Sequence, residues 1–241
     1  MKSSRLLLRL TISVFVVAVL VAGYFLYRKY ATDARRSVLV IAWLNDPLAH
    51  PDWAIHVGER CGEAPFIFPT SGFIGYLWDD SFRVNHRHQG IDIFGGGEPG
   101  KVAVRAAYAG YLTRLPEWKS SLIVRISQDP LYPKRQIWLY YTHLADAEGK
   151  SYIVPEFPPG TSETYVDAGT LLGYQGNYSG DSNNPTGVHL HFSIVLDDPS
   201  NPGHFLNELE IRNTLDPSPY FGLPLNANTN KGEVPVCPKE K

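Results

Sequence analysis

The chain has 241 residues, of which 44% are apolar and 19% are charged, so a packed core is expected and global disorder is excluded. Glycine and proline are frequent, at 21 and 19 residues, and with many aromatic residues they favour strands and turns over a helical bundle. The net charge of −2 hides an asymmetry, because residues 1–36 carry +6 and the remainder carries −8. An acidic main part argues against nucleic acid as a partner.

An uncharged, apolar run at residues 10–27 predicts a transmembrane helix. Its 18 residues would form a helix of about 27 Å, close to the ~30 Å hydrocarbon core of a bilayer. The alternative is a cleaved signal peptide. However, no small-residue cleavage site follows the run, and the run is longer than the usual apolar region of about 7–15 residues. We therefore expect an uncleaved membrane anchor.

The rest of the chain has the patterns of a β domain. Residues 37–44 form a short apolar run that could be a strand or a buried connector, and residues 45–60 resemble a loop. No long amphipathic helix is evident after residue 37. Residues 207–213 fit one or two helical turns, and the Pro- and Asn-rich residues from 214 on predict an irregular tail. The clearest strand patterns lie at residues 101–112, 121–126, 136–144 and 188–196.

These patterns divide the chain into four parts. The composition changes after the basic N-terminal segment, and strand patterns begin and end within the main part. The parts are an N-terminal anchor with basic flanks (1–36), a connector (37–63), a main β domain (64–205) and a C-terminal extension (206–241).

Two cysteines, Cys61 and Cys237, stand on either side of the main domain. Outside the cytoplasm they could form a disulfide that ties the start of the domain to the tail. The alternative is two free, buried thiols. The sequence leaves both open because it does not show whether the two residues are close in space.

Four of the eight histidines fall in three short patterns, H-x-x-x-D, Y-x-H-L and H-x-H-F. Each pattern alone is weak evidence, because such spacings arise readily by chance and a histidine is often an ordinary surface or core residue. These patterns occur together on predicted strands whose opposite faces are apolar and which are flanked by glycines. This combination indicates a functional site. The patterns contain His88 with Asp92, His143, and His189 with His191.

Strand geometry predicts how these side chains point. Side chains alternate between the faces of a strand, so residues two apart share a face. His189 and His191 therefore share one face, and the apolar residues between and after them form the other. If residues 88–92 are extended, their histidine and aspartate also share a face. The same alternation places His143 on the face of Tyr141.

Two histidines and one carboxylate are a sufficient ligand set for catalytic zinc. They fill three tetrahedral positions and leave the fourth for water. Zinc lowers the pKa of that water towards about 7 and polarises a substrate carbonyl. Further histidines that do not bind the metal could move the proton and stabilise the developing oxyanion.

Residues 66–196 resemble the lysostaphin/LytM-like M23 metallopeptidases, which are cell-wall endopeptidases. The matching segments, in order, are HQGIDI, a glycine loop, KVAVRAAYAGYL, YTHL, DAGTLLGYQGNYSG and PTGVHLHF. The resemblance implies an all-β domain of mostly antiparallel sheet with an open groove, here preceded by one N-terminal transmembrane helix. It also implies that loops wall the groove, at residues 72–85, 129–135, 151–163 and 177–184.

Carried over residue by residue, the resemblance makes His88, Asp92 and His191 the ligands of one zinc ion per chain. It makes His143 and His189 the two catalytic histidines, acting as general base or as stabilisers of the tetrahedral intermediate. All five positions that the family pattern requires are therefore filled.

The chain departs from the family pattern near the first ligand. Many members carry a tyrosine shortly before that histidine, whereas here the nearby positions are Phe82 and Asn85, with Tyr76 further back. The role of this tyrosine is therefore left unassigned. His86 is expected to be a neighbour and not a ligand, because only His88 stands four residues before the aspartate.

The function that the resemblance implies is a membrane-anchored zinc endopeptidase that hydrolyses peptide bonds in bacterial peptidoglycan. Its expected partners are the peptidoglycan peptide and a membrane through residues 10–27, with the main domain periplasmic or extracellular. A protein regulator is left open. One alternative is a non-catalytic adaptor that activates other wall hydrolases, although such relatives lose metal ligands. Another is a metal- or carbohydrate-binding β domain, which leaves the histidine pattern to coincidence.

Overall fold

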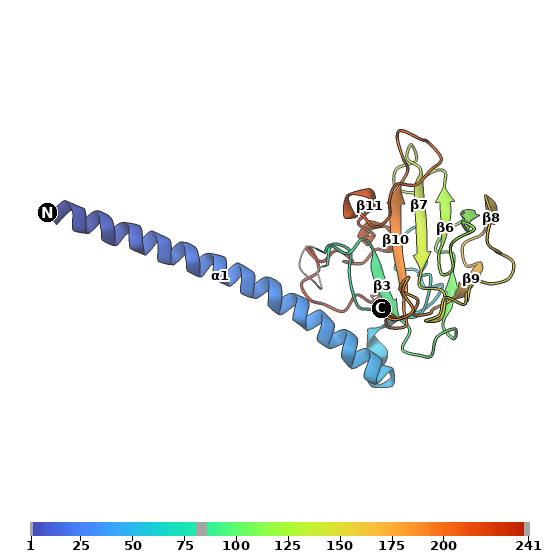
Figure 1. Ribbon diagram of the computed structural model, residues 1–241, viewed down its shortest axis with the longest axis horizontal. Helices are drawn as coiled ribbons and strands as arrows, with labels where there is room; N and C mark the ends of the chain where they lie inside the picture. Colours follow the sequence, from blue (N-terminus) through green and yellow to red (C-terminus); the bar gives the residue numbers. More distant parts are fainter. Residues whose placement is uncertain (1, 81–85, 239–241) are drawn as a thin grey trace.

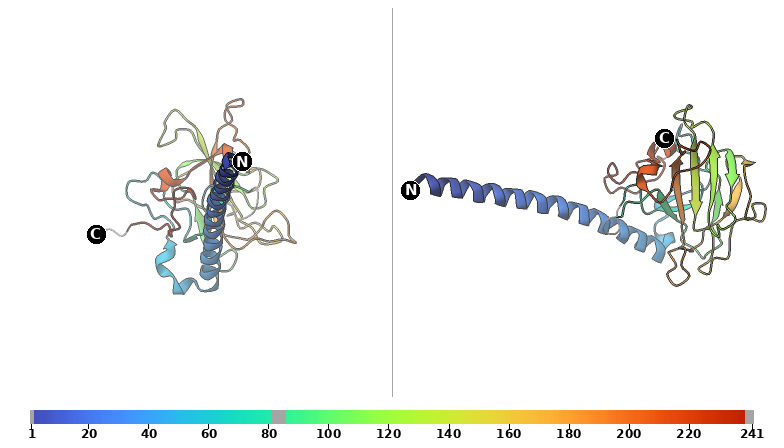
Figure 2. Two further views of the ribbon diagram at one scale, coloured as in Figure 1. Left: turned by 90° about the vertical axis from the view of Figure 1, so that its left-hand side faces the viewer. Right: turned by 45° about the horizontal axis from the view of Figure 1, so that its top comes forward.

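The computed structural model describes residues 2–80 and 86–238 of the chain. A long N-terminal helix, α1 (Lys2–Asn45), projects away from a β domain formed by the rest of the chain (Figure 1). The right-hand view of Figure 2 also shows that the start of α1 lies far from this domain. Two short 3-10 helices, η1 (Pro47–Ala49) and η2 (Pro51–Trp53), connect α1 to the first strand.

The last turns of α1 pack on the β domain. The helix continues through residues 37–44, so of the two alternatives for this run the strand is excluded, and the run is part of a partly buried helix. Val40 and Trp43 are buried in a cluster with Phe73 and Phe94, and the Trp43 Nε1–H group donates to the carbonyl oxygen of Phe94 at 2.7 Å. The run is apolar because this face of the helix is covered by the domain.

Further towards its start, α1 carries exposed apolar side chains. Val14, Phe15 and Leu20 are each about two-thirds exposed, at 67%, 69% and 66%. Within the part of the chain that the structure describes, no helix has both the length and the apolar character to cross a membrane. The transmembrane helix expected at residues 10–27 stays a prediction.

The domain consists mainly of strands joined by turn-rich loops. The four regions with the clearest strand patterns all contain strands, and residues 101–112 contain two of them. The strands are β1 (Ala54–Ile55), β2 (Gly72–Ile74), β3 (Ile91–Phe94), β4 (Ala103–Arg105), β5 (Gly110–Thr113), β6 (Leu122–Ile126), β7 (Ile137–Thr142), β8 (Thr164–Val166), β9 (Leu171–Tyr174), β10 (Leu190–Leu196) and β11 (Thr214–Leu215).

One sheet dominates this domain, with the strand order β1-β2-β3-β10-β7-β6-β5-β8 and with β11 also paired to β10. A separate pair joins β4 to β9. Each of these strand pairs is antiparallel, which confirms the predicted mostly antiparallel fold. The long strands β10 and β7 lie side by side at the centre of the sheet (Figure 1).

The alternation predicted for β10 is present. Leu190, Phe192 and Ile194 are buried in the main hydrophobic core, which accounts for their spacing of two. His191 and Ser193 lie on the opposite face, where the His191 Nε2 atom is 2.9 Å from the Ser193 hydroxyl oxygen. A core-facing strand therefore presents its imidazole away from the core.

The C-terminal residues complete the same core. After the 3-10 helix η3 (Ile211–Asn213) and β11, a short helix α2 (Ser218–Phe221) places Tyr220 and Phe221 in the main core. Leu223 and Leu225 are also buried there. The expectation of an irregular tail is therefore wrong for this stretch, because its apolar residues pack in the core although they follow no period.

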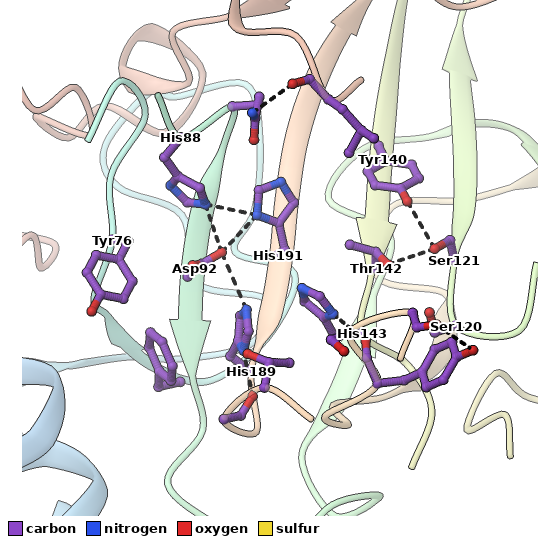
Figure 3. A pocket seen from close by; sticks show the side chains of 18 of the residues that line it. Tyr76, His88, Asp92, Ser120, Ser121, Tyr140, Thr142, His143, His189 and His191 are labelled. Carbon is purple, nitrogen blue, oxygen red and sulfur yellow. Dashed lines mark hydrogen bonds and ion pairs between the residues drawn. The ribbon is translucent and has the colours of Figure 1, made fainter. Parts of the chain in front are cut away.

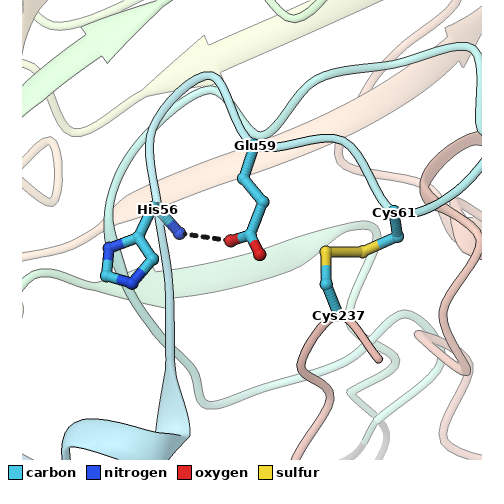
Figure 4. The surroundings of a disulfide bond; sticks show 4 residues. All are labelled: His56, Glu59, Cys61 and Cys237. Carbon is cyan, nitrogen blue, oxygen red and sulfur yellow. Dashed lines mark hydrogen bonds between the residues drawn. A yellow bond between two sulfur atoms is a disulfide. The ribbon is translucent and has the colours of Figure 1, made fainter. Parts of the chain in front are cut away.

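A disulfide joins Cys61 to Cys237, which decides between the alternatives left open above (Figure 4). The two residues are separated by 176 positions, so the bond ties the first loops of the domain to its tail. Beside it, the backbone N–H of His56 donates to the Glu59 carboxylate at 2.8 Å (Figure 4). This crosslink closes almost the whole β domain into one covalent loop.

We expect the disulfide to stabilise the chain by about 2–5 kcal/mol, because it removes conformational freedom from the unfolded state. Urea unfolding of the full chain in detergent should show this loss of free energy of unfolding when Cys61 and Cys237 are both replaced by serine. A reductant should destabilise the parent chain and leave the double variant unchanged. Equal stability of the two chains would contradict the prediction.

Candidate metal centre

The pairing of β3 with β10 places two of the expected metal ligands opposite each other. Asp92 of β3 and His191 of β10 are direct partners in the antiparallel register. The residue before β3 is Gly90, where an added Cβ would lie 2.1 Å from the carbonyl oxygen of Phe192. Only glycine allows this close approach. His88, two residues earlier, completes the group from the loop before β3.

The side chains of His88, Asp92 and His191 meet at one point (Figure 3). The Asp92 Oδ1 atom lies 3.0 Å from His88 Nε2 and 2.8 Å from His191 Nδ1, and the two ring nitrogens are 3.0 Å apart. His88 and Asp92 are buried, at 3% and 6% exposed. The structure thus brings the three predicted ligands together as a group that could hold a metal ion.

Backbone carbonyl groups set the tautomers of three histidines around this point. Each of these histidines has its Nδ1 atom within hydrogen-bond distance of a carbonyl oxygen, which can only accept. Nδ1 therefore carries the proton, and the neutral ring has its lone pair at Nε2. The pairs are His88 with Leu77 at 2.9 Å, His143 with Tyr178 at 2.6 Å and His189 with Gly187 at 2.7 Å.

The three predicted ligands fit a cation. The Nε2 lone pair of His88 faces the Asp92 carboxylate, so two acceptors lie 3.0 Å apart. Burial opposes protonation of His88, yet Asp92 raises the pKa of this histidine above its ordinary value. Burial alone would raise the pKa of Asp92, yet His88 and His189 hold that pKa well below its ordinary value. The site therefore favours a positive charge at this point, as a metal ion would supply.

His143 reaches the same site through an unusual backbone conformation. It directly follows β7 and has a φ of 70°, in the left-handed region that residues other than glycine rarely adopt. Strand alternation would place it with the core residue Tyr141, so that expectation is wrong. The left-handed turn instead directs the imidazole into the cavity that Thr142 also lines.

His143 and His189 form a neutral pair beside the three predicted ligands. Their ring centroids are 4.5 Å apart, and His189 Nε2 lies 3.6 Å from the Asp92 carboxylate (Figure 3). Burial lowers the pKa of His189 to about 3 and also lowers the pKa of His143. Both rings are therefore uncharged near pH 7 and each can accept a proton at Nε2.

These five residues open into a cavity of about 640 Å³. Two of the four predicted loops contribute to its wall, through Tyr76 and Tyr178. The other two, at residues 129–135 and 151–163, do not contribute to the described lining of this cavity, so their place beside a groove stays a prediction. Asp129 instead has a structural role, since its carboxylate forms an ion pair with Arg135 at 2.6 Å.

The cavity is also lined by residues that no sequence pattern predicted. Val40 and Leu44 of α1 line one side, because the helix packs on the domain. Glu208 lines another part, and burial raises the pKa of its carboxyl group. Ser121 and Thr142 contribute hydroxyl groups 2.7 Å apart. No motif marks these residues, since their place depends on how distant segments pack.

Two residues near the first ligand also line the cavity. The ring of Tyr76 lies 6.4 Å from the ring of His88, so the tyrosine left unassigned above faces the site. The ring of His86 stacks at the same distance from His88, and His86 is not part of the group that could hold a metal ion. Phe82 and Asn85, the other two positions considered for the tyrosine role, lie outside the described residues.

The sequence matches no protein-family model and no curated protein. The chain is similar in structure to a Ruminococcus gnavus protein described as a glycyl-glycine endopeptidase LytM (26% identity, 49% of this chain and 43% of that one, TM-score 0.32). It is also similar to Helicobacter pylori Csd3 (20% identity, 58% of this chain and 30% of that one, TM-score 0.32). A third similar structure is a Pseudomonas aeruginosa protein described as an M23 peptidase (18% identity, 76% of this chain and 62% of that one, TM-score 0.37). This chain spans less than two thirds of each structure, and every TM-score is below 0.5. The function therefore has to be inferred from the side chains.

We expect His191→Ala to abolish stoichiometric metal binding, because it removes one of the three converging donor atoms. The loss of zinc affinity should exceed the roughly 10–100-fold effect typical of a residue that only supports a ligand. Elemental analysis and chelator competition on the full chain measure this effect. His204→Ala is the matched control, since His204 is exposed and lines no part of the cavity. Undiminished zinc in His191→Ala would show that His191 is not a ligand.

Proposed function

We propose that the chain is a zinc endopeptidase that hydrolyses peptide bonds in bacterial peptidoglycan. The observation that carries this proposal is the group of buried His88, buried Asp92 and half-buried His191 beside two neutral histidines in an open cavity. Metal donors next to uncharged proton acceptors are the combination that metal-assisted hydrolysis requires.

In this proposal His88, Asp92 and His191 hold one zinc ion per chain. Two imidazole nitrogens and one carboxylate oxygen are a common ligand set for catalytic zinc. Bound zinc would supply an activated water and polarise the scissile carbonyl. The Leu77 carbonyl, which accepts from His88 Nδ1, keeps the ring oriented with Nε2 towards the centre.

His143 and His189 would carry out the proton transfers. Each donates its Nδ1–H to a backbone carbonyl, so the lone pair at Nε2 can accept a proton of the attacking water. The protonated ring can then donate that proton to the leaving amine. The other ring, which stays neutral, can orient the attacking water by accepting a hydrogen bond at its own Nε2. Burial keeps both rings neutral in the resting site.

The motif resemblance of residues 66–196 and the residues that line the site support the proposed substrate class. The cavity is lined by α1 on one side and by residues 178–180 on another, so a peptide can pass between them. The wall at Ser121 and Thr142 offers hydroxyl groups that can bind peptide N–H and C=O groups. Peptidoglycan cross-links and stem peptides are flexible peptides, which such a cavity could bind.

We further propose that residues 10–27 anchor the enzyme in a membrane, with the peptidase domain outside the cytoplasm. The uncharged run and the exposed apolar side chains at residues 11–25 support an apolar environment for this part of α1. The Cys61–Cys237 disulfide supports an oxidising compartment for the domain.

The peptidase proposal predicts that His189→Ala retains zinc but loses about 10²–10⁴-fold in turnover, because a proton-transfer group is removed while the donor atoms stay. Release of soluble muropeptides from purified peptidoglycan by the full chain in detergent measures turnover, with a chelator control. His56→Ala, away from the cavity, should match the parent. Cleavage by His189→Ala at the parent rate would rule out its catalytic role. Zinc binding without any cleavage by the parent would favour the adaptor alternative.

The anchor proposal predicts that the full chain stays with membranes after extraction with alkaline carbonate. The double variant Val17→Arg with Leu20→Arg should move to the soluble fraction, because charged side chains are costly in a bilayer core. Val38→Arg is the control, since Val38 is an equally exposed apolar residue of α1 that lies outside residues 10–27. If the double variant partitions like Val38→Arg, residues 10–27 are not the anchor.

A further inference from the structure

Arg36, on the last third of α1, is buried although it carries a charge. It is only 4% exposed. Its guanidinium group donates to the carbonyl oxygen of Gly75 at 3.1 Å and to the side-chain oxygen of Asn230 at 2.7 Å. Its Nε atom lies 3.5 Å from the carboxylate of Asp80, which is also buried. A buried guanidinium is costly unless it is paired, so these contacts hold α1 against residues 75–80.

Residues 75–80 in turn hold the metal ligand His88. The Asp80 carboxylate, which faces Arg36, accepts from the backbone N–H of Leu77 at 3.3 Å. The carbonyl oxygen of Leu77 accepts from His88 Nδ1 at 2.9 Å, and the carbonyl oxygen of Asp80 accepts from the backbone N–H of His88 at 2.8 Å. Both the backbone and the ring of His88 are therefore fixed by a segment that Arg36 holds.

The same segment contacts the second ligand, Asp92. The backbone N–H of Gly75 donates to the carbonyl oxygen of Asp92 at 2.9 Å, and the N–H of Asp92 donates to the carbonyl oxygen of Tyr76 at 3.0 Å. Helix α1 lies directly on this segment, because a Cβ added to Gly75 would lie 2.6 Å from Val40 Cγ2. A shift of the helix would thus move the backbone that supports two of the three ligands.

We propose that Arg36 is a positioning residue for the metal centre and that it acts through Asp80 and Leu77 on the ring of His88. The proposal rests on the proposed function, in which His88 binds zinc. It makes the N-terminal helix part of the machinery that prepares the site, in addition to its role as an anchor. The groups that fix a ligand's orientation commonly affect metal affinity by about 10–100-fold.

The test compares variants of the full chain in detergent. Arg36→Met removes the charge and keeps the length of the side chain, and Asp80→Asn removes the opposing charge with little change of shape. Each should weaken zinc affinity by about 10-fold, measured by chelator competition, and should alter the visible absorption spectrum of the Co²⁺-loaded chain. The double variant should lose less than the product of the two single effects, because both act through one contact.

Arg135→Met is the matched control. It breaks another ion pair, with the fully buried Asp129 at 2.6 Å, and neither residue lines the cavity. It should lower the free energy of unfolding while it keeps the zinc affinity and the Co²⁺ spectrum of the parent. This control separates a positioning effect from a general loss of stability. If Arg36→Met does not fold, Asp80→Asn carries the same test.

Parent-like zinc affinity and Co²⁺ spectrum in Arg36→Met or Asp80→Asn, with zinc bound by the parent, would overturn this inference alone. The same would follow if Arg135→Met changed both readouts as strongly as the Arg36 variant does. A parent chain that binds no zinc would overturn the proposed function, and this inference with it. A selective, less than additive loss in the Arg36 and Asp80 variants is the result that supports it.

Discussion

A buried carboxylate surrounded by imidazole nitrogens is the constraint on which the rest of this structure depends. Asp92 lies within 3.6 Å of ring nitrogens of His88, His189 and His191, in a part of the domain with little access to water. In a medium of low dielectric constant, such a group is stable only if positive charge is shared among its members. The β3–β10 pairing places Asp92 and His191 opposite each other, so the fold holds a carboxylate and imidazole nitrogens in a group that could bind a cation.

Much of the fold and of the candidate site could be predicted because both depend on local periodicity. The spacing of two in β10 identified which residues face the core, and Leu190 and Phe192 are buried there as expected. The same spacing, with the H-x-x-x-D pattern, selected residues that the structure brings within one cavity. Their roles in metal binding and catalysis stay predictions. The mostly antiparallel arrangement was expected from the resemblance to the M23 metallopeptidases, and the strand pairing confirms it.

The expectations that failed depend on packing between distant segments or on a single backbone angle. Residues 37–44 form a helix because Arg36 and Trp43 find partners in the domain, and a short apolar run does not reveal those partners. His143 leaves the strand alternation at one positive φ, which no neighbouring residue type signals. Tyr220 belongs to the core although its segment has no period. The disulfide needed spatial proximity, which the sequence does not contain.

The disulfide has a consequence for the covalent topology of the chain. Cys61 and Cys237 enclose both the candidate metal ligands and the loops around the cavity, including the exposed loop at residues 179–185. A single cut anywhere within that ring leaves one covalently connected molecule with two new ends. Nicked and intact chains would therefore migrate together on a denaturing gel without reductant and would separate only after reduction. A protease that acts once on an exposed loop of this ring therefore cannot detach the part of the β domain that follows the cut from helix α1.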